Sequence, residues 1–87
     1  MAKVFIPAQM RDVTGGVAEL EVVGENLRQI ITALDERFPG LADRVMHDGK
    51  IAPGLAVSID NEIASMGLLD KVAENSEVHF VPAIAGG

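Results

Sequence analysis

Side chains capable of covalent chemistry are scarce in this chain of 87 residues, which directs attention to its last residues. It contains no cysteine, so disulfides, thiolate metal sites and cysteine nucleophiles are excluded. Its two histidines, His47 and His79, stand apart without ligand spacing, and we expect no metal site. The sequence closes on VPAIAGG, where small uncharged residues lead to the carboxylate of Gly87. Glycines are also common where a terminus simply frays, so the rest of the sequence must decide whether this end is functional.

Composition and charge narrow the class of protein. The length fits one domain with a modest core. Seven basic residues face thirteen acidic ones, a net charge of −6, and the basic residues form no cluster, which predicts no nucleic-acid partner. The acidic excess favours solubility and would also steer the domain towards a basic protein surface. No apolar run is long enough to cross a membrane, so we expect no membrane partner and a cytoplasmic location.

The first two strands are predicted to form a hairpin. Residues 3–7 favour a strand that places Val4 and Ile6 on one face and Phe5 on the other. Residues 17–23 alternate between apolar and acidic side chains, as a half-buried strand does. The inward residues of this second strand are expected to be Ala18, Leu20 and Val22. Thr14, Gly15 and Gly16, after an irregular stretch, supply turn chemistry rather than a phosphate loop, because no helix follows them.

The clearest element is an amphipathic helix over residues 26–38. Asn26 suits the N-cap, Gln29 completes a capping-box pattern, and Pro39 ends the helix. The buried stripe is predicted to comprise Leu27, Ile30, Ile31, Leu34 and Phe38. One such helix must cover one face of a sheet.

The second half of the chain contains shorter elements. Residues 41–46 predict a short helical turn with Leu41 and Val45 inward, and residues 47–54 a polar loop. A strand is expected at 55–60, with Leu55, Val57 and Ile59 together on one face, followed by a turn at Asp60 and Asn61 and a short strand at 62–64. A helical turn or loop is expected at 68–76. The final strand is expected at 77–82, with Val78 and Phe80 inward and His79 and Val81 outward.

This order of elements predicts an α+β fold, the ubiquitin-like β-grasp, with a mixed sheet of four or five strands packed on one main helix. The first strand would pair with the second and, in parallel, with the last, which would lie in the middle of the sheet. Residues 1–82 would form the domain, and residues 83–87 a flexible tail ending in Gly-Gly. The predicted core is Val4, Ile6, Leu20, Val22, Leu27, Ile30, Ile31, Leu34, Val57, Ile59, Val78 and Phe80.

The sequence resembles the ThiS/MoaD family of ubiquitin-like sulfur carriers over nearly its whole length. The resemblance rests on KVFIP at the start, RFPGL after the helix, PGLAVSIDNE, and above all VHFVPAIAGG at the end. One departure is ENSE before the last strand, where much of the family has a Gly-Asp turn; we expect Asn75 to take the left-handed conformation there.

The resemblance implies a protein co-substrate without catalytic residues of its own. In the family, an E1-like enzyme uses ATP and Mg²⁺ to adenylate the terminal carboxylate, sulfur then replaces AMP, and the thiocarboxylate donates sulfur to a biosynthetic enzyme. Carried over, the reacting group is the Gly87 carboxylate, and no cofactor is bound by the carrier itself. Pro82 would stop the strand, and the residues recognised by the partner would be Pro82, Ala83, Ile84, Ala85 and Gly86.

Several alternatives stay open at the level of function. Within the family, RDVTGG and VPAIAGG look most like the carrier of cysteine biosynthesis, followed by the small, non-catalytic subunit of molybdopterin synthase and then the thiamine carrier. Outside it stand a modifier conjugated to lysines through Gly87, and a plain interaction module. On the carrier hypothesis, Phe5, His79 and Val81 would form an apolar docking patch for the activating enzyme on the outward face of the sheet.

Overall fold

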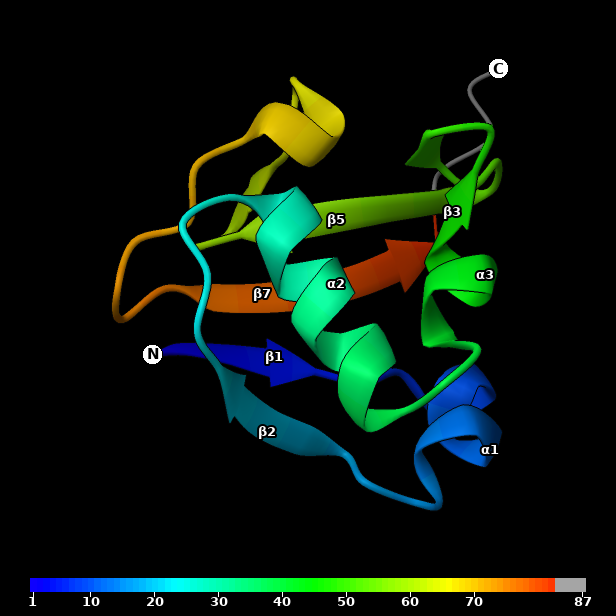
Figure 1. Ribbon diagram of the computed structural model, residues 1–87. Helices are drawn as coiled ribbons and strands as arrows, with labels where there is room; N and C mark the ends of the chain where they lie inside the picture. The colour runs from blue at the N-terminus through cyan, green and yellow to red at the C-terminus, as the bar shows by residue number, and fades with distance from the viewer. Residues whose placement is uncertain (83–87) are drawn as a thin grey trace.

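The computed structural model describes residues 1–82 of the chain. Five strands form one sheet, and the longest helix lies across it (Figure 1). The elements are β1 (Ala2–Phe5), the 3₁₀ turn η1 (Ala8–Met10), α1 (Arg11–Thr14), β2 (Glu19–Val22), α2 (Leu27–Arg37), α3 (Leu41–Val45), β3 (Met46–His47), β4 (Lys50–Ile51), β5 (Leu55–Ile59), β6 (Glu62–Ile63), the 3₁₀ turn η2 (Gly67–Leu69) and β7 (Glu77–Pro82).

The strand order of the main sheet is β2-β1-β7-β5-β6. β1 pairs with β2 in antiparallel and with β7 in parallel orientation, so the last strand lies in the middle, as predicted. β5 and β6 complete the sheet as an antiparallel hairpin through Asp60 and Asn61. Both turn residues have positive φ angles, 52° and 71°, which a two-residue hairpin connection of this kind requires. The β-grasp prediction is therefore confirmed.

The core lies between the sheet and α2. Leu27, Ile30 and Leu34 on the helix have no exposed surface, and neither do Val4 and Val78 on the two central strands. For four residues in this region the predicted burial was too high. Ala18 is exposed because β2 begins only at Glu19, and Phe38 is half-buried because it is the C-cap of α2. Leu20 and Ile59, which were predicted for the core, are also half-buried and pack against it.

The start of α2 follows the predicted cap with one difference. The Asn26 side chain accepts a hydrogen bond from the Gln29 amide at 2.9 Å, which satisfies one of the free donors of the first turn. The Gln29 side chain, however, accepts from the amide of Glu25 at 2.8 Å rather than from that of Asn26. The capping box is therefore present, but the bond from the Gln29 side chain goes to the residue before the N-cap.

The connection between β1 and β2 is helical where the sequence predicted an irregular stretch. Residues 8–14 form η1 and α1, and Gly15 ends α1 with a φ of 67°. The buried Thr14 hydroxyl lies 3.0 Å from the Val17 carbonyl and donates a hydrogen bond that fixes the exit of the turn. Thr14 and Gly15 thus cap a helix end rather than making a tight hairpin turn.

A second correction concerns residues 47–54, which were expected to be a polar loop. β3 and β4 form a small antiparallel hairpin, in which Met46 pairs with Ile51. Asp48 and Gly49 connect the two strands with φ angles of 52° and 75°. Strands of two residues carry too little alternation to be recognised, although Asp-Gly is a strong hairpin signal.

One prediction about the approach to the last strand was wrong. Asn75 is absent from the non-glycine residues of positive φ in the described part of the chain; the turn is closed by the Ser76 amide, which donates to the Ala73 carbonyl at 3.1 Å. β7 itself ends at Pro82, as predicted, and Pro82 pairs with Leu55 as the last residue of the strand.

In the part of the chain that the structure describes, every helix is too short or too polar to cross a membrane.

Candidate functional site

Strand β7 forms a firmly held platform that leads to the reactive end predicted from the sequence. It pairs with β1 over three residues and with β5 over five, up to the pair of Pro82 and Leu55. The position of Pro82, from which the chain continues, is therefore fixed by the sheet. The predicted reacting residue Gly87 and the recognition residues Ala83, Ile84, Ala85 and Gly86 lie outside the described residues.

Phe5, His79 and Val81, here called the outer patch, lie together on the sheet face opposite α2. Phe5 and His79 occupy paired positions on β1 and β7, and their rings are stacked with centroids 4.2 Å apart and planes 2° apart. Val81 is on the same face two residues further along β7. All three are half-buried, so they present flat side-chain surface rather than projecting tips. The structure thus brings together the three residues that the alternation placed there.

The register of the sheet adds Ile63 to the same face. His79 lies opposite Ser58 on β5, and Ser58 lies opposite Ile63 on β6. Directly paired residues share a face, so Ile63 extends the row across three strand spacings, about 14 Å from Phe5. Ile63 is 62% exposed. It was missed because residues 62–64 are too short to show alternation, although counting back from the Asp60 turn would have identified it.

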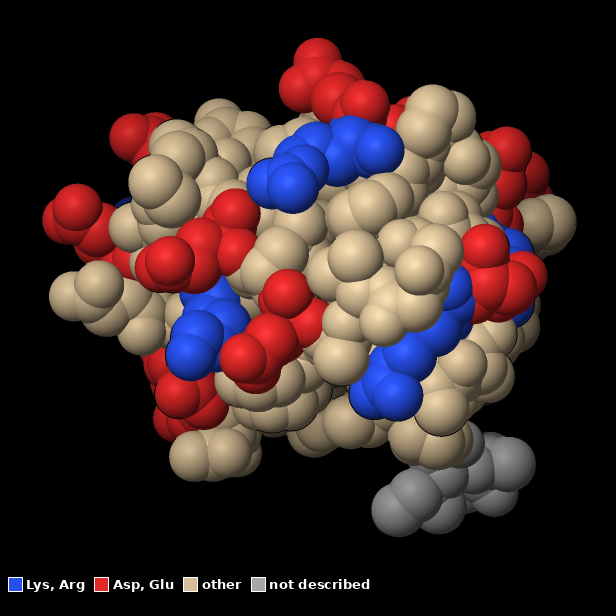
Figure 2. All heavy atoms as spheres, turned by 90° about the horizontal axis from the view of Figure 1, so that it is seen from below, with Lys and Arg blue, Asp and Glu red and all other residues tan. Residues whose placement is uncertain are grey.

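Charged side chains border the outer patch at the β2 edge. Lys3, two residues before Phe5, places its ammonium 6.0 Å from the centre of the Phe5 ring, within range of a cation–π contact. Glu19 and Glu21 on β2 lie opposite Phe5 and Lys3. A partner covering the patch therefore meets an apolar surface with carboxylates along one side. Figure 2 views the molecule from below, the side on which Figure 1 draws β2. On this side the basic side chains are separated by acidic and uncharged ones.

Asp60 fixes the register that aligns β7 with β5. Its carboxylate accepts hydrogen bonds from the Ser76 hydroxyl at 2.7 Å and from the Glu77 amide at 2.9 Å, while its own amide donates to the Glu77 carbonyl. The Ser76 hydroxyl and then the Glu77 amide stabilise the anion, and together they lower the pKa of Asp60 below its ordinary value of 3.8. The same residue thus ends β5 and starts β7 in the correct pairing.

The two histidines have local partners in the structure. His79 stacks on Phe5, and His47 lies 3.3 Å from the Asp48 carboxylate on the β3–β4 hairpin. Among residues 1–82, no three metal-ligating side chains come together in a group that could hold an ion. What the described side chains offer is a partly apolar surface beside the end of β7.

A five-stranded mixed sheet with a parallel central pair, covered on one face by one long helix, defines a ubiquitin-like β-grasp protein. The ThiS family matches residues 4–87, and the chain belongs to this family. The Sulfur carrier protein CysO of Mycobacterium tuberculosis is 30% identical over 89 aligned positions, covering 97% of this chain and 96% of that protein.

Solved structures show the same similarity. CysO in the BexX/CysO complex of Amycolatopsis orientalis superposes with a TM-score of 0.92 at 29% identity, with both chains covered completely. SAMP1 of Haloferax volcanii, a small archaeal modifier protein, superposes with a TM-score of 0.72 at 25% identity, covering 99% of this chain and 98% of that one.

Proposed function

We propose that this protein is a sulfur carrier, a co-substrate whose Gly87 carboxylate is adenylated and then converted to a thiocarboxylate. The observation that carries the proposal is the similarity to CysO sulfur carriers over essentially the whole chain, including the residues after β7. A frayed end alone would not need a strand anchored on both sides up to Pro82.

The chemistry requires a second protein. A carboxylate is a poor acyl donor until one oxygen becomes part of a good leaving group. In the proposed first step, a Gly87 carboxylate oxygen attacks the α-phosphorus of ATP, and pyrophosphate leaves. In the second, a hydrosulfide ion attacks the acyl carbon, AMP leaves with the bonding electrons, and loss of the sulfur-bound proton gives the thiocarboxylate. The activating enzyme binds ATP and Mg²⁺; the carrier supplies a carboxylate on small residues, which can enter a narrow channel because Gly86 and Gly87 have no Cβ.

The outer patch is proposed as the docking surface for the activating enzyme. It is apolar, lies on β1 and on β7, the strand that ends directly before residues 83–87, and is stiffened by the stacked rings of Phe5 and His79. A solved structure of CysO in complex with BexX supports the expectation that such carriers work through protein partners. The patch and the terminal segment, residues 83–87, would then be bound by one enzyme at the same time.

The favoured pathway is cysteine biosynthesis, since the relatives named CysO match the chain almost end to end. The other pathways within the family are the biosynthesis of molybdopterin and of thiamine. In the molybdopterin case the protein would be the small subunit of the synthase.

The second candidate is a modifier joined to lysines through Gly87. It is favoured by the similarity to SAMP1, a small archaeal modifier protein. Both functions begin with an activated Gly87 carboxylate, so they differ only in the nucleophile that follows.

Intact mass of the chain isolated from its native host separates the candidates. The carrier predicts a fraction in which one oxygen of Gly87 is replaced by sulfur, and the modifier predicts conjugates of higher mass. Oxidation of any of the four methionines raises the mass by nearly as much as replacement of oxygen by sulfur, so intact mass alone does not distinguish the two. Alkylation with iodoacetamide distinguishes them. Because the chain has no cysteine, a single alkylation that fragmentation places on Gly87 reports the thiocarboxylate. A terminal carboxylate that is never alkylated and never conjugated contradicts both candidates.

A further inference from the structure

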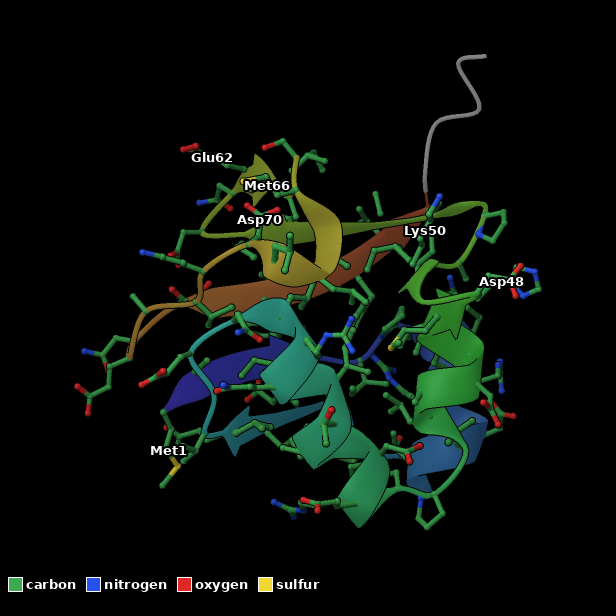
Figure 3. The ribbon with its side chains drawn as sticks, turned by 45° about the horizontal axis from the view of Figure 1, so that its top comes forward. Met1, Asp48, Lys50, Glu62, Met66 and Asp70 are labelled. Atoms are coloured by element: carbon green, nitrogen blue, oxygen red, sulfur yellow. The ribbon has the colours of Figure 1, made fainter. Side chains whose placement is uncertain are left out.

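A groove of about 610 Å³ opens on the helix side of the sheet, away from the outer patch. Its walls come from the first turn of α2, the β3–β4 hairpin, and the segment from β6 through η2. The residues that define it are Arg28, Lys50, Ile51, Met66, Leu68 and Leu69. Figure 3 shows Lys50 on β4 and Met66 before η2 on the side of the molecule that comes forward in that view.

The groove is positively charged although the chain is acidic. Arg28 and Lys50 are the charged residues among its walls, in a protein with a net charge of −6. The ion pairs found within residues 1–82 join Arg44 to Asp12 and His47 to Asp48, so they leave both of these cations out. A carboxylate is the complementary ligand for cations that line one groove.

The rest of the groove is apolar and unusually accessible. Met66 is 64% exposed and Leu69 67% exposed, which places both among the most exposed large hydrophobic side chains of the described residues. Leu68 is buried and Ile51 half-buried, and they connect this surface to the core. The nearby Asp70 carboxylate is already engaged, because it accepts a hydrogen bond from the Met66 amide at 2.6 Å. The ligand that fits is therefore an apolar segment ending in a carboxylate.

Such a segment begins close by in the same chain. Pro82 pairs with Leu55 on β5, which places their Cα atoms about 5 Å apart. The Leu55 amide donates to the Ala52 carbonyl at 3.1 Å, closing a turn whose ends lie less than about 7 Å apart. Ile51 follows directly, so the groove starts no more than about 16 Å from Pro82. Residues 83–87 extend up to about 17 Å, and the Lys50 side chain adds to that reach.

We propose that the terminal segment, residues 83–87, folds back into this groove of its own chain. The Gly87 carboxylate pairs with Lys50 and Arg28, and the apolar residues before it lie against the apolar wall of the groove. The folded-back form is in equilibrium with an extended form in which the segment is free to enter a partner. This inference concerns the isolated chain and does not depend on what is later attached to Gly87.

Paramagnetic relaxation in the full chain tests the proposal directly. The exposed Ser65 lies at the groove, and a nitroxide on Ser65→Cys labels one site only, because the chain has no other cysteine. We expect the amide signals of residues 84–87 to relax at least threefold faster in this protein than in the same labelled protein carrying Arg28→Gln and Lys50→Gln. The matched control carries Arg37→Gln and Lys71→Gln, which remove the same charge outside the groove and should leave the fast relaxation unchanged.

Two results would overturn the proposal. One is equal relaxation of residues 84–87 in the labelled protein and in its Arg28→Gln, Lys50→Gln variant, which would show that the terminal segment does not bind the groove. The other is fast relaxation that appears when isotope-labelled chain without nitroxide is mixed with nitroxide-labelled chain without isotope, because the segment would then belong to a second copy. Thermal melts of each variant check that the fold is intact.

Discussion

Val81→Asp is the sharpest probe of the outer patch, because it places a charge within the proposed contact without entering the core. Val81 is half-buried on the sheet face opposite α2 and lies across from Ala56. A solvated Asp side chain there should change the free energy of unfolding by no more than about 1 kcal/mol. Once an enzyme covers the patch, the carboxylate is desolvated without a partner, and an uncompensated buried charge costs about 3–5 kcal/mol.

That penalty corresponds to a loss of two to three and a half orders of magnitude, on the scale of about 1.4 kcal/mol per tenfold change. The assay is ATP-dependent acyl-adenylate formation by the cognate activating enzyme, measured as kcat/KM for the carrier. The matched control is Val23→Asp, which adds the same charge at a 71% exposed position near the other end of β1. Unchanged kcat/KM in a folded Val81→Asp protein would refute the docking role of the patch.

Three further predictions concern the scaffold. Leu34→Ala should reduce the free energy of unfolding by about 2–5 kcal/mol, because Leu34 on α2 is fully buried between the helix and the sheet; a loss below about 0.5 kcal/mol in a urea titration would contradict this. Gly24→Ala should cost about 1–3 kcal/mol, since the added Cβ would lie 2.8 Å from Ile30 Cδ1 and 3.1 Å from its backbone nitrogen; an unchanged melting temperature would disagree. The pKa of Asp60 is lowered in the folded state, so its carboxylate contributes fully to stability above about pH 3.8, and this contribution disappears as the pH falls through the lower pKa of the folded protein. Asp60→Asn should therefore lose less stability on acidification than the parent. Identical acid titrations of the two proteins would contradict the stabilising role of the Asp60 carboxylate.

Most of the sheet and helix could be predicted from the sequence because their signals are local and repeated. The stripe on α2 and the alternation around Val4 and Val78 each recur over several residues, and both periods agree on one core. Phe5 and His79 could be placed together because the predicted topology made their strands parallel neighbours.

The parts that were missed depend on tertiary pairing. The β3–β4 hairpin consists of strands of two residues each, too short for a period to appear. The groove between Arg28 and Lys50 joins residues more than twenty positions apart and has no sequence pattern of its own.

The most direct test of the account is adenylation of the chain when its end is moved by one residue. Deleting Gly87, or adding one residue after it, leaves β7 and the core untouched, so the melting temperature should stay the same. The reacting carboxylate, however, is displaced by about 3.3 Å from where the enzyme holds the α-phosphate, and a displacement of about 1 Å already costs on the order of a hundredfold. Acyl-adenylate formation with the activating enzyme, ATP and Mg²⁺ should be lost in both variants while their melting temperatures are unchanged. Undiminished adenylation of the extended chain would contradict the central claim that the Gly87 carboxylate is the reacting group.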